Sequence, residues 1–164
     1  MTDITVRNAT AADFDAIVAL NATEVDHTSP MDLARLRLLD AVSVYHKVAT
    51  ADGRVAGFLL AMRDGSDYIN DNFAWFSSRY DSFLYVDRIV VDGPYRDLKL
   101  GTLLYRDIFA CARRMGARAV ACEYNLVPPN EPSRRFHDKF AFRQVGTQWL
   151  GDGNKQVSLQ LATP

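Results

Sequence analysis

A strand, a basic loop and a helix start follow one another between Val90 and Leu104, and that order of elements suits an anion. The first N–H groups of a helix have no partner inside the helix and lie at the positive end of its dipole. Successive N–H groups from Leu98 to Thr102 can therefore surround a phosphate or pyrophosphate. Arg96 adds a cation for charge-assisted hydrogen bonds. These residues predict a phosphate-bearing ligand, and the alternative is an ordinary strand-to-helix connection.

The composition is that of an ordinary globular domain. The chain has 164 residues, so we expect a single domain over 1–164. Hydrophobic residues make up 48% and charged residues 24%, and the formal net charge is -1. Because there is no overall basic field, neither nucleic acid nor an anionic membrane is expected as a partner. An anionic ligand must therefore be bound by a local arrangement.

The cysteines and the chain start indicate a reducing compartment. Cys111 and Cys122 form no CxxC pair, and no histidine and cysteine cluster has metal-ligand spacing, so no metal is expected. The first residues hold no apolar signal-peptide segment. No apolar run approaches the roughly 18 residues of a membrane span. We therefore expect a cytoplasmic protein with reduced thiols.

The elements that must position the loop follow from hydrophobic periodicity and turn residues. Strand 83–91, helix 101–115 and strand 117–122 are typical of a right-handed crossover between parallel strands. The sequence therefore predicts one α/β domain with a mixed sheet. The predicted strands cover 4–7, 44–50, 55–62, 83–91, 117–122, 142–150 and 157–161, and the predicted helices begin near Thr10, Ser29, Gly101 and Asn130.

The segment 63–82 is a long connection in which aromatic residues alternate with Asp67, Asp71 and Asp81. A connection of this length in a compact domain is usually functional or has local structure of its own. The alternative is a small apolar cluster beneath the connection.

Two separated motifs resemble those of the GNAT superfamily of N-acetyltransferases. Arg96-Asp97-Leu98-Lys99-Leu100-Gly101 is similar to the family's acetyl-CoA pattern Gln/Arg-x-x-Gly-x-Gly/Ala, and it follows Val91-Asp92-Gly93-Pro94-Tyr95. The stretch from Asn130 to Phe142 resembles Asn-x-x-Ser/Ala-x-x-x-Tyr-x-x-x-Gly-Phe. The order of elements is similar over the whole chain, whereas residue-level similarity is confined to 83–142.

The resemblance implies a GNAT-like α/β (α+β) fold, with a mixed, mostly antiparallel sheet of about seven strands, about four flanking helices and a central parallel βαβ crossover. It implies acetyl-CoA as cosubstrate, with the pantetheine arm paired to the strand near Val90. Asn130 is also a candidate helix N-cap. The implied cofactor-binding residues are Ile89, Val90, Val91, Arg96, Asp97, Leu98, Lys99, Leu100, Gly101, Thr102, Asn125, Asn130 and Ser133.

Two residues depart from the family's loop pattern. Lys99 occupies the first glycine position, where a side chain is tolerated if φ is negative. Its ammonium group can meet a phosphate. The carboxylate of Asp97 repels phosphate unless it points away or pairs with Lys99.

Acetyl transfer to an amine requires removal of an amine proton, and the departing thiolate can be protonated. Several family members carry a carboxylate base at the strand position of Asp87, and Glu123 is the rival base, with a chain of water molecules as the third option. The alternative for Asp87 is a structural pair with Arg88 or another basic group, although the Arg88 pair is awkward because adjacent strand side chains point to opposite faces. His137 stands where the family usually has a proton-donating tyrosine, and a structural role is its alternative.

The resemblance therefore implies an acyltransferase that moves the acetyl group of acetyl-CoA to a primary amine of a small molecule or peptide by direct attack on the thioester. The alternative is a CoA-binding or sensor domain of the same fold with weak chemistry, because Lys99 and His137 depart from the motifs. Aspartates among aromatic side chains in 63–82 would suit a cationic amine. Homodimers are common in the family, so this segment is a candidate interface as well as a candidate pocket.

Overall fold

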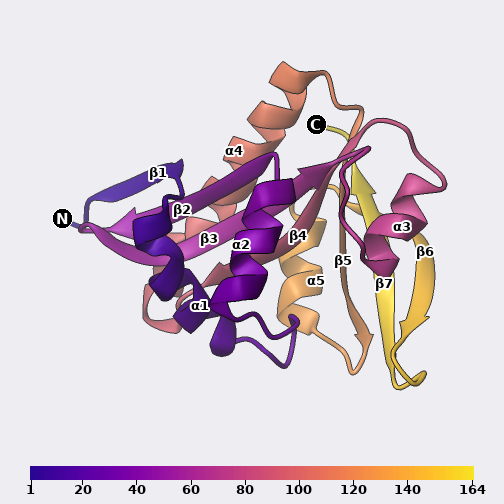
Figure 1. Ribbon diagram of the computed structural model, residues 1–164, viewed down its shortest axis with the longest axis horizontal. Coiled ribbons are helices and arrows are strands. Elements are labelled where there is room, and N and C mark those ends of the chain that lie inside the picture. The colour runs from indigo at the N-terminus through magenta and orange to yellow at the C-terminus, as the bar shows by residue number, and fades with distance from the viewer. The chain divides into compact units, whose positions relative to one another are not determined.

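The computed structural model describes all residues from Met1 to Pro164. It has seven strands, five α-helices and two short 3-10 helices (Figure 1). No helix combines the length and apolar character that crossing a bilayer requires. In chain order the elements are β1 (Ile4–Asn8), η1 (Ala11–Asp13), α1 (Phe14–Ala22), α2 (Leu33–Val42), β2 (Tyr45–Ala51), β3 (Arg54–Arg63), α3 (Asp71–Ser77), β4 (Phe83–Val91), η2 (Gly93–Leu98), α4 (Leu100–Met115), β5 (Ala119–Val127), α5 (Glu131–Asp138), β6 (Arg143–Leu150) and β7 (Lys155–Ala162).

The seven strands are hydrogen-bonded in the order β1-β2-β3-β4-β5-β7-β6. β4 and β5 are parallel, whereas β1 and β2, β2 and β3, β5 and β7, and β6 and β7 are antiparallel. The predicted fold class, a mixed and mostly antiparallel sheet with a parallel pair, is therefore confirmed. The chain divides into two compact units, unit 1 (residues 1–62 and 86–111) and unit 2 (residues 63–85 and 112–164).

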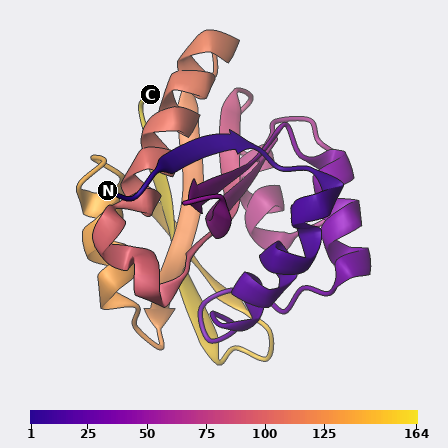
Figure 2. The ribbon, with the colours of Figure 1, turned by 90° about the vertical axis from the view of Figure 1, so that its left-hand side faces the viewer.

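In unit 1, α1 and α4 cover opposite faces of the strands (Figures 1 and 2). Two successive residues of β2 show why. The hydroxyl of Tyr45 donates to Asp107 of α4 at 2.8 Å, whereas the ring of His46 stacks on Phe14 of α1 with centroids 6.0 Å apart. Because adjacent strand side chains point to opposite faces, β2 carries one helix on each side.

Turns and caps set the boundaries within unit 1. The hairpin between β2 and β3 turns at Asp52 and Gly53, whose φ angles are 49° and 79°, as a type I′ turn requires. α2 begins at Leu33, later than the predicted start near Ser29. The reason is its N-cap, because the Asp32 side chain accepts a hydrogen bond from the N–H of Arg35 at 2.8 Å.

In unit 2, the segment 63–82 forms an additional helix, α3, which the side chain of Asn70 caps. The rings of Phe73 and Phe76 from this helix lie 5.6 and 5.9 Å from the ring of Tyr85 on β4. All three side chains are buried. The aromatic residues of this connection therefore form both local structure and an apolar cluster.

α5 covers the other face of the strands of unit 2. On β5, the carboxylate of Glu123 meets Tyr85, on the face that α3 covers. The ring of the next residue, Tyr124, lies 5.7 Å from the ring of His137 on α5. Strand alternation therefore separates the α3 face from the α5 face.

Candidate functional site

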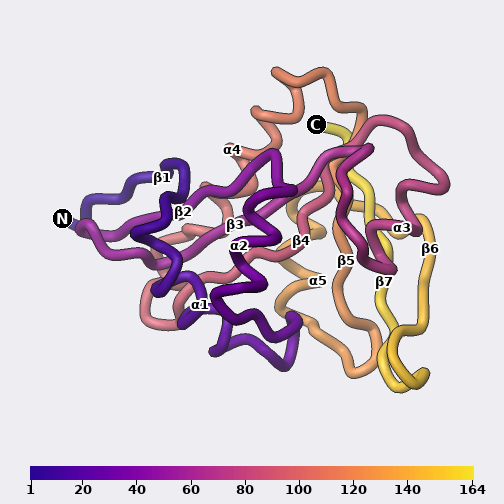
Figure 3. The backbone as a smooth tube through the Cα atoms, viewed as in Figure 1, coloured from indigo at the N-terminus to yellow at the C-terminus, as the bar shows by residue number.

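The path of the chain from β4 to α4 can be followed in Figure 3. This connection is the short helix η2, and it ends in one left-handed residue. Just after β4, the N–H of Asp92 donates to the carbonyl of Ala56 at 2.8 Å, which fixes the strand end. Lys99 then has φ 56° and ψ 37°. The condition stated for a side chain at Lys99, a negative φ, is therefore not met, because the chain passes from η2 into α4 through a left-handed cap.

Three N–H groups are available at the start of α4. The first bond along the helix runs from the N–H of Leu103 to the carbonyl of Lys99 at 3.1 Å, so Leu100, Gly101 and Thr102 have no acceptor inside the helix. The N–H of Lys99 itself donates to Arg96 at 3.3 Å. Of the predicted N–H donors from Leu98 to Thr102, those of Leu100, Gly101 and Thr102 are therefore the three available to a ligand. The buried side chain of Leu100 holds them in place.

The charged side chains around this helix start, Arg96, Asp97 and Lys99, are exposed. Arg96 donates to Glu24, in the connection after α1, at 2.6 Å, and its side chain is 62% exposed. An exposed pair of this kind contributes about 0–1 kcal/mol, so an incoming phosphate can replace Glu24. Asp97 and Lys99 are both exposed and make no ion pair with each other.

The strand backbone predicted to meet pantetheine lies at the end of β4. Val90 is buried, and its neighbours Ile89 and Val91 are half-buried. β3 approaches closely here, because a Cβ on Gly57 would lie 3.1 Å from the carbonyl oxygen of Val90. Glycine at this position permits that approach.

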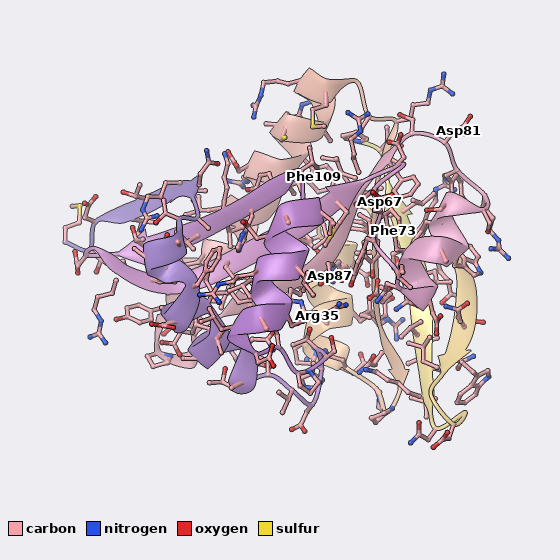
Figure 4. The ribbon with its side chains drawn as sticks, viewed as in Figure 1. Arg35, Asp67, Phe73, Asp81, Asp87 and Phe109 are labelled. Carbon is pink, nitrogen blue, oxygen red and sulfur yellow. The ribbon has the colours of Figure 1, made fainter.

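Asp87 is buried in an ion pair with Arg88. Figure 4 labels Asp87 among the side chains. The arginine Nε lies 2.7 Å from the carboxylate Oδ2, and the two side chains are 3% and 4% exposed. The pair with Arg88, which strand alternation makes awkward, is therefore present. The arginine side chain is long enough for its guanidinium to reach back to the preceding carboxylate.

The same guanidinium ties β4 to the connection between α1 and α2. Arg88 Nη1 donates to Asn21 Oδ1 and to the carbonyl of Ser29, and Nη2 donates to the Ser29 hydroxyl, each at 3.0 Å. The sequence analysis missed Asn21 and Ser29. An arginine inside an apolar strand was the only signal, because its partners lie 59 and 67 residues away.

Glu123 lies on β5 and is held by a phenol. The hydroxyl of Tyr85 lies 2.9 and 2.8 Å from the two oxygens of the Glu123 carboxylate. Tyr85 is fully buried in the aromatic cluster of unit 2. A rigid neutral donor therefore orients this carboxylate.

Four of the predicted residues of unit 2 form one hydrogen-bonded series. The N–H of Asn130 donates to the carbonyl of Asn125 at 3.2 Å, and the Asn130 side chain accepts from the N–H of Ser133 at 3.3 Å. The carbonyl of Ser133 lies 2.7 Å from Nδ1 of His137. Asn130 is therefore the N-cap of α5, the alternative considered for it.

His137 is buried on α5 and oriented by this series. A carbonyl oxygen only accepts, so Nδ1 carries the proton that it donates to Ser133. Burial lowers the pKa of His137 below its usual value, against the raising effect of this hydrogen bond. His137 contacts Tyr124, so it lies on the opposite face of β5 from the side chain of Glu123.

Asn125 has an unsatisfied donor. Its side-chain Nδ2 is buried and has no hydrogen-bond partner. Leaving a buried amide N–H unpaired costs about 1–3 kcal/mol, so such a group calls for a ligand or water. This is the one predicted cofactor-binding side chain with buried, unused hydrogen-bonding capacity.

The comparisons with known proteins agree with this architecture. The sequence pattern of the Acetyltransferase (GNAT) family matches residues 11–142. No curated protein matches the sequence significantly. Solved structures with the same fold include Ard1 from Thermoplasma volcanium, at 17% identity and a TM-score of 0.78, over 98% of this chain and 99% of that one.

Two further structures extend the comparison. An N-acetyltransferase from Staphylococcus aureus shares 19% identity at a TM-score of 0.74, over 98% of both chains. The acetyltransferase yncA from Salmonella typhimurium, described as putative, was solved with its cofactor acetyl-CoA and shares 20% identity at a TM-score of 0.71, over 98% of this chain and 93% of that one. These identities establish the fold alone, whereas the family match covers most of the chain. The chain therefore belongs to the GNAT acetyltransferase family.

Proposed function

We propose that this protein is an acetyl-CoA-dependent N-acetyltransferase whose acceptor is a primary amine of a small molecule or peptide. One observation is the main support for acetyl-CoA as the cosubstrate. At the start of a 16-residue helix, three N–H groups have no acceptor inside the helix, those of Leu100, Gly101 and Thr102. Such a helix start favours a phosphate through both its donors and its dipole. Arg96 is the nearby cation that can join them.

Each unit offers groups that suit a part of acetyl-CoA. Asn125 holds a buried amide donor without a partner, which suits a carbonyl of a pantetheine arm. The α4 donors suit the pyrophosphate. When bound, acetyl-CoA supplies an activated thioester carbonyl.

Glu123 is the better-supported base of the two carboxylates. The Asp87 carboxylate is already engaged by Arg88, whose Nε lies 2.7 Å from its Oδ2 in a buried ion pair, and this geometry supports a structural role for Asp87. Glu123 accepts from the neutral phenol of Tyr85, which orients the carboxylate without adding a positive charge. In this proposal Glu123 takes the amine proton, and the Asp87 pair holds the connection between α1 and α2.

The role of His137 stays a prediction. Its proton on Nδ1 is donated to Ser133, and burial favours the neutral ring, so at neutral pH Nε2 carries no proton to give to a thiolate. This geometry supports a role for His137 in the packing of α5, rather than as a proton donor.

The cofactor half is tested by acetyl-CoA calorimetry on Gly101→Asp and its matched control Gly101→Asn. The two variants differ only in the charge beside the helix start. We expect the aspartate to weaken acetyl-CoA binding at least about tenfold relative to the asparagine, which corresponds to about 1.4 kcal/mol. Equal affinities in folded variants would contradict the loop assignment.

The catalytic half is tested by free-thiol release from acetyl-CoA with a polyamine, an amino acid derivative, an aminoglycoside and a peptide with a free N-terminus. We expect amine-dependent release with at least one of them, and a loss of at least about a hundredfold in Glu123→Gln with acetyl-CoA affinity retained. Asp87→Asn is the matched comparison, and a larger loss there would move the base role to Asp87. Saturable binding without thiol release from any amine would instead support the CoA-sensor alternative.

A further inference from the structure

β7 buries its polar face. Along this strand Val157, Leu159 and Leu161 alternate with polar residues, a pattern typical of a strand with one face in water. Yet Ser158 is fully buried and Gln160 is 2% exposed. Polar side chains are buried when hydrogen bonds compensate, so this face forms a polar floor.

The polar floor lies beside a cavity of about 430 Å³ in unit 2. α5 contributes Arg134 and Asp138 to its wall, and β5 contributes Tyr124. A cavity of this size is in the range of small-molecule sites. Because Tyr124 and Glu123 are adjacent on β5, the cavity lies on the opposite face from the Glu123 side chain.

The hydrogen bonds of the floor leave specific atoms for a ligand. The Ser158 hydroxyl donates to Gln144 Oε1 at 2.6 Å, and Gln160 Nε2 donates to Ser158 at 2.6 Å and to the Tyr124 oxygen at 3.2 Å. Gln160 Oε1 remains an acceptor. Gln144 Nε2 remains a donor. The Tyr124 hydroxyl is already hydrogen-bonded to Ser158 and Gln160, and burial raises its pKa.

A cationic side chain, Arg134, and an anionic one, Asp138, lie one helical turn apart on α5 in the wall of the cavity. Arg134 has its nearest carboxylate, Glu131, at 3.7 Å, which is longer than a hydrogen bond. Asp138 makes no ion pair. The cavity therefore offers donors and a cation for an anionic group, and acceptors and an anion for a cationic group.

We propose that this cavity binds a free α-amino acid as its zwitterion. The carboxylate is bound by Arg134 and Gln144 Nε2, and the ammonium group by Asp138 and Gln160 Oε1. The amino acid side chain packs on the two apolar residues of the lining, Leu126 and Phe142. The site uses none of the residues assigned to acetyl-CoA or to proton transfer, so it is independent of the proposed function.

The test is an NMR titration of ¹⁵N-labelled full-length protein with L-leucine. L-leucinamide, which lacks the carboxylate, and 4-methylpentanoate, which lacks the ammonium group, are the ligand controls. We expect saturable shifts in α5 and β7 with L-leucine, and binding at least about tenfold weaker with either control, because each loses a charge-assisted interaction.

Arg134→Gln and Arg135→Gln are the matched protein variants. Both side chains are exposed on α5, but only Arg134 lines the cavity. We expect Arg134→Gln to weaken L-leucine binding at least about tenfold and Arg135→Gln to change it less than about twofold. No saturable shift up to about 10 mM L-leucine, equal binding of a control ligand, or equal affinities of the two folded variants would each overturn the proposal.

Discussion

Lys99 carries a side chain in a conformation that favours glycine. Its φ of 56° places the lysine Cβ close to its own backbone, at the residue that links η2 to α4. Because the cap fixes the direction in which α4 starts, the strain is held at the predicted anion site. Replacement of a residue with a strained backbone conformation can stabilise the folded protein.

We predict that Lys99→Gly raises the free energy of unfolding by about 0.5–1 kcal/mol, since relief of strain exceeds the added freedom of the unfolded chain. Urea unfolding measures this. Lys139→Gly is the control, because Lys139 caps α5 with φ -64°, where glycine only adds unfolded-state entropy and lowers stability. A loss of stability in both variants would contradict the strain argument.

Asp13 makes unit 1 sensitive to acid. Its carboxylate accepts from Arg7 at 2.8 Å and from the N–H of Thr10 at 2.8 Å. The hydrogen bond from Arg7 is the main reason that the pKa of Asp13 falls to about 2. A carboxyl group with a lowered folded-state pKa stabilises the protein above its unfolded-state value of about 3.9, and this contribution is lost as the pH falls toward 2.

We predict that Asp13→Asn lowers the free energy of unfolding at pH 7 by about 1–2 kcal/mol, a value reduced for the exposed partner Arg7. The difference from wild type should shrink between about pH 4 and pH 2 in urea unfolding experiments. Asp15→Asn, at an exposed position on α1, should show neither effect. A pH-independent difference for Asp13→Asn would count against the ion pair.

Among the elements, α3 packs against β6 at one glycine, Gly146. Asn72 of α3 accepts from Gln148 of β6 at 3.1 Å. Close by, a Cβ on Gly146 would lie 2.9 Å from Cη2 of Trp75 and closer still to its Cζ2. The ring of Trp75 is itself held by Arg79, whose guanidinium carbon lies 4.0 Å from the ring centroid. β6 therefore needs glycine where α3 packs on it.

We predict that Gly146→Ala lowers the free energy of unfolding by about 1–3 kcal/mol, because the added methyl group forces the indole to move. Gly93→Ala is the control, since a Cβ at Gly93 meets nothing within 4 Å. Thermal and urea unfolding measure both variants. In a double-mutant cycle, Trp75→Leu should remove most of the penalty, and additive effects would show that the contact is not its cause.

At the scale of the whole molecule, the fold is retained among proteins of very different sequence. Three solved structures of the same fold superpose on 98% of this chain at identities of 17–20%. A fold maintained at such identities constrains where strands and helices run, whereas the acceptor depends on individual side chains. The family membership therefore defines a reaction class, and thiol release with different amines must define the acceptor.

Much of the fold was predictable from sequence, because its signals are local. β4 has the predicted bounds, and the turn at Asp52 and Gly53 lies between the predicted strands 44–50 and 55–62. α3 was not predicted as a helix, because seven residues between polar turns leave a weak periodic signal. Asn70, which caps it, was the available clue.

For the candidate site, the amino-acid sequence by itself determined the residue types and the helix start that can bind a phosphate, because a motif and a helix N-terminus are properties of consecutive residues. Only the tertiary structure decided the partners: Arg88 for Asp87, Tyr85 for Glu123 and Glu24 for Arg96. Two of these partners lie 38 and 72 positions away along the chain, and the third depends on how one long side chain bends. Hydrogen bonds depend on distance in space, which folding sets and sequence spacing does not.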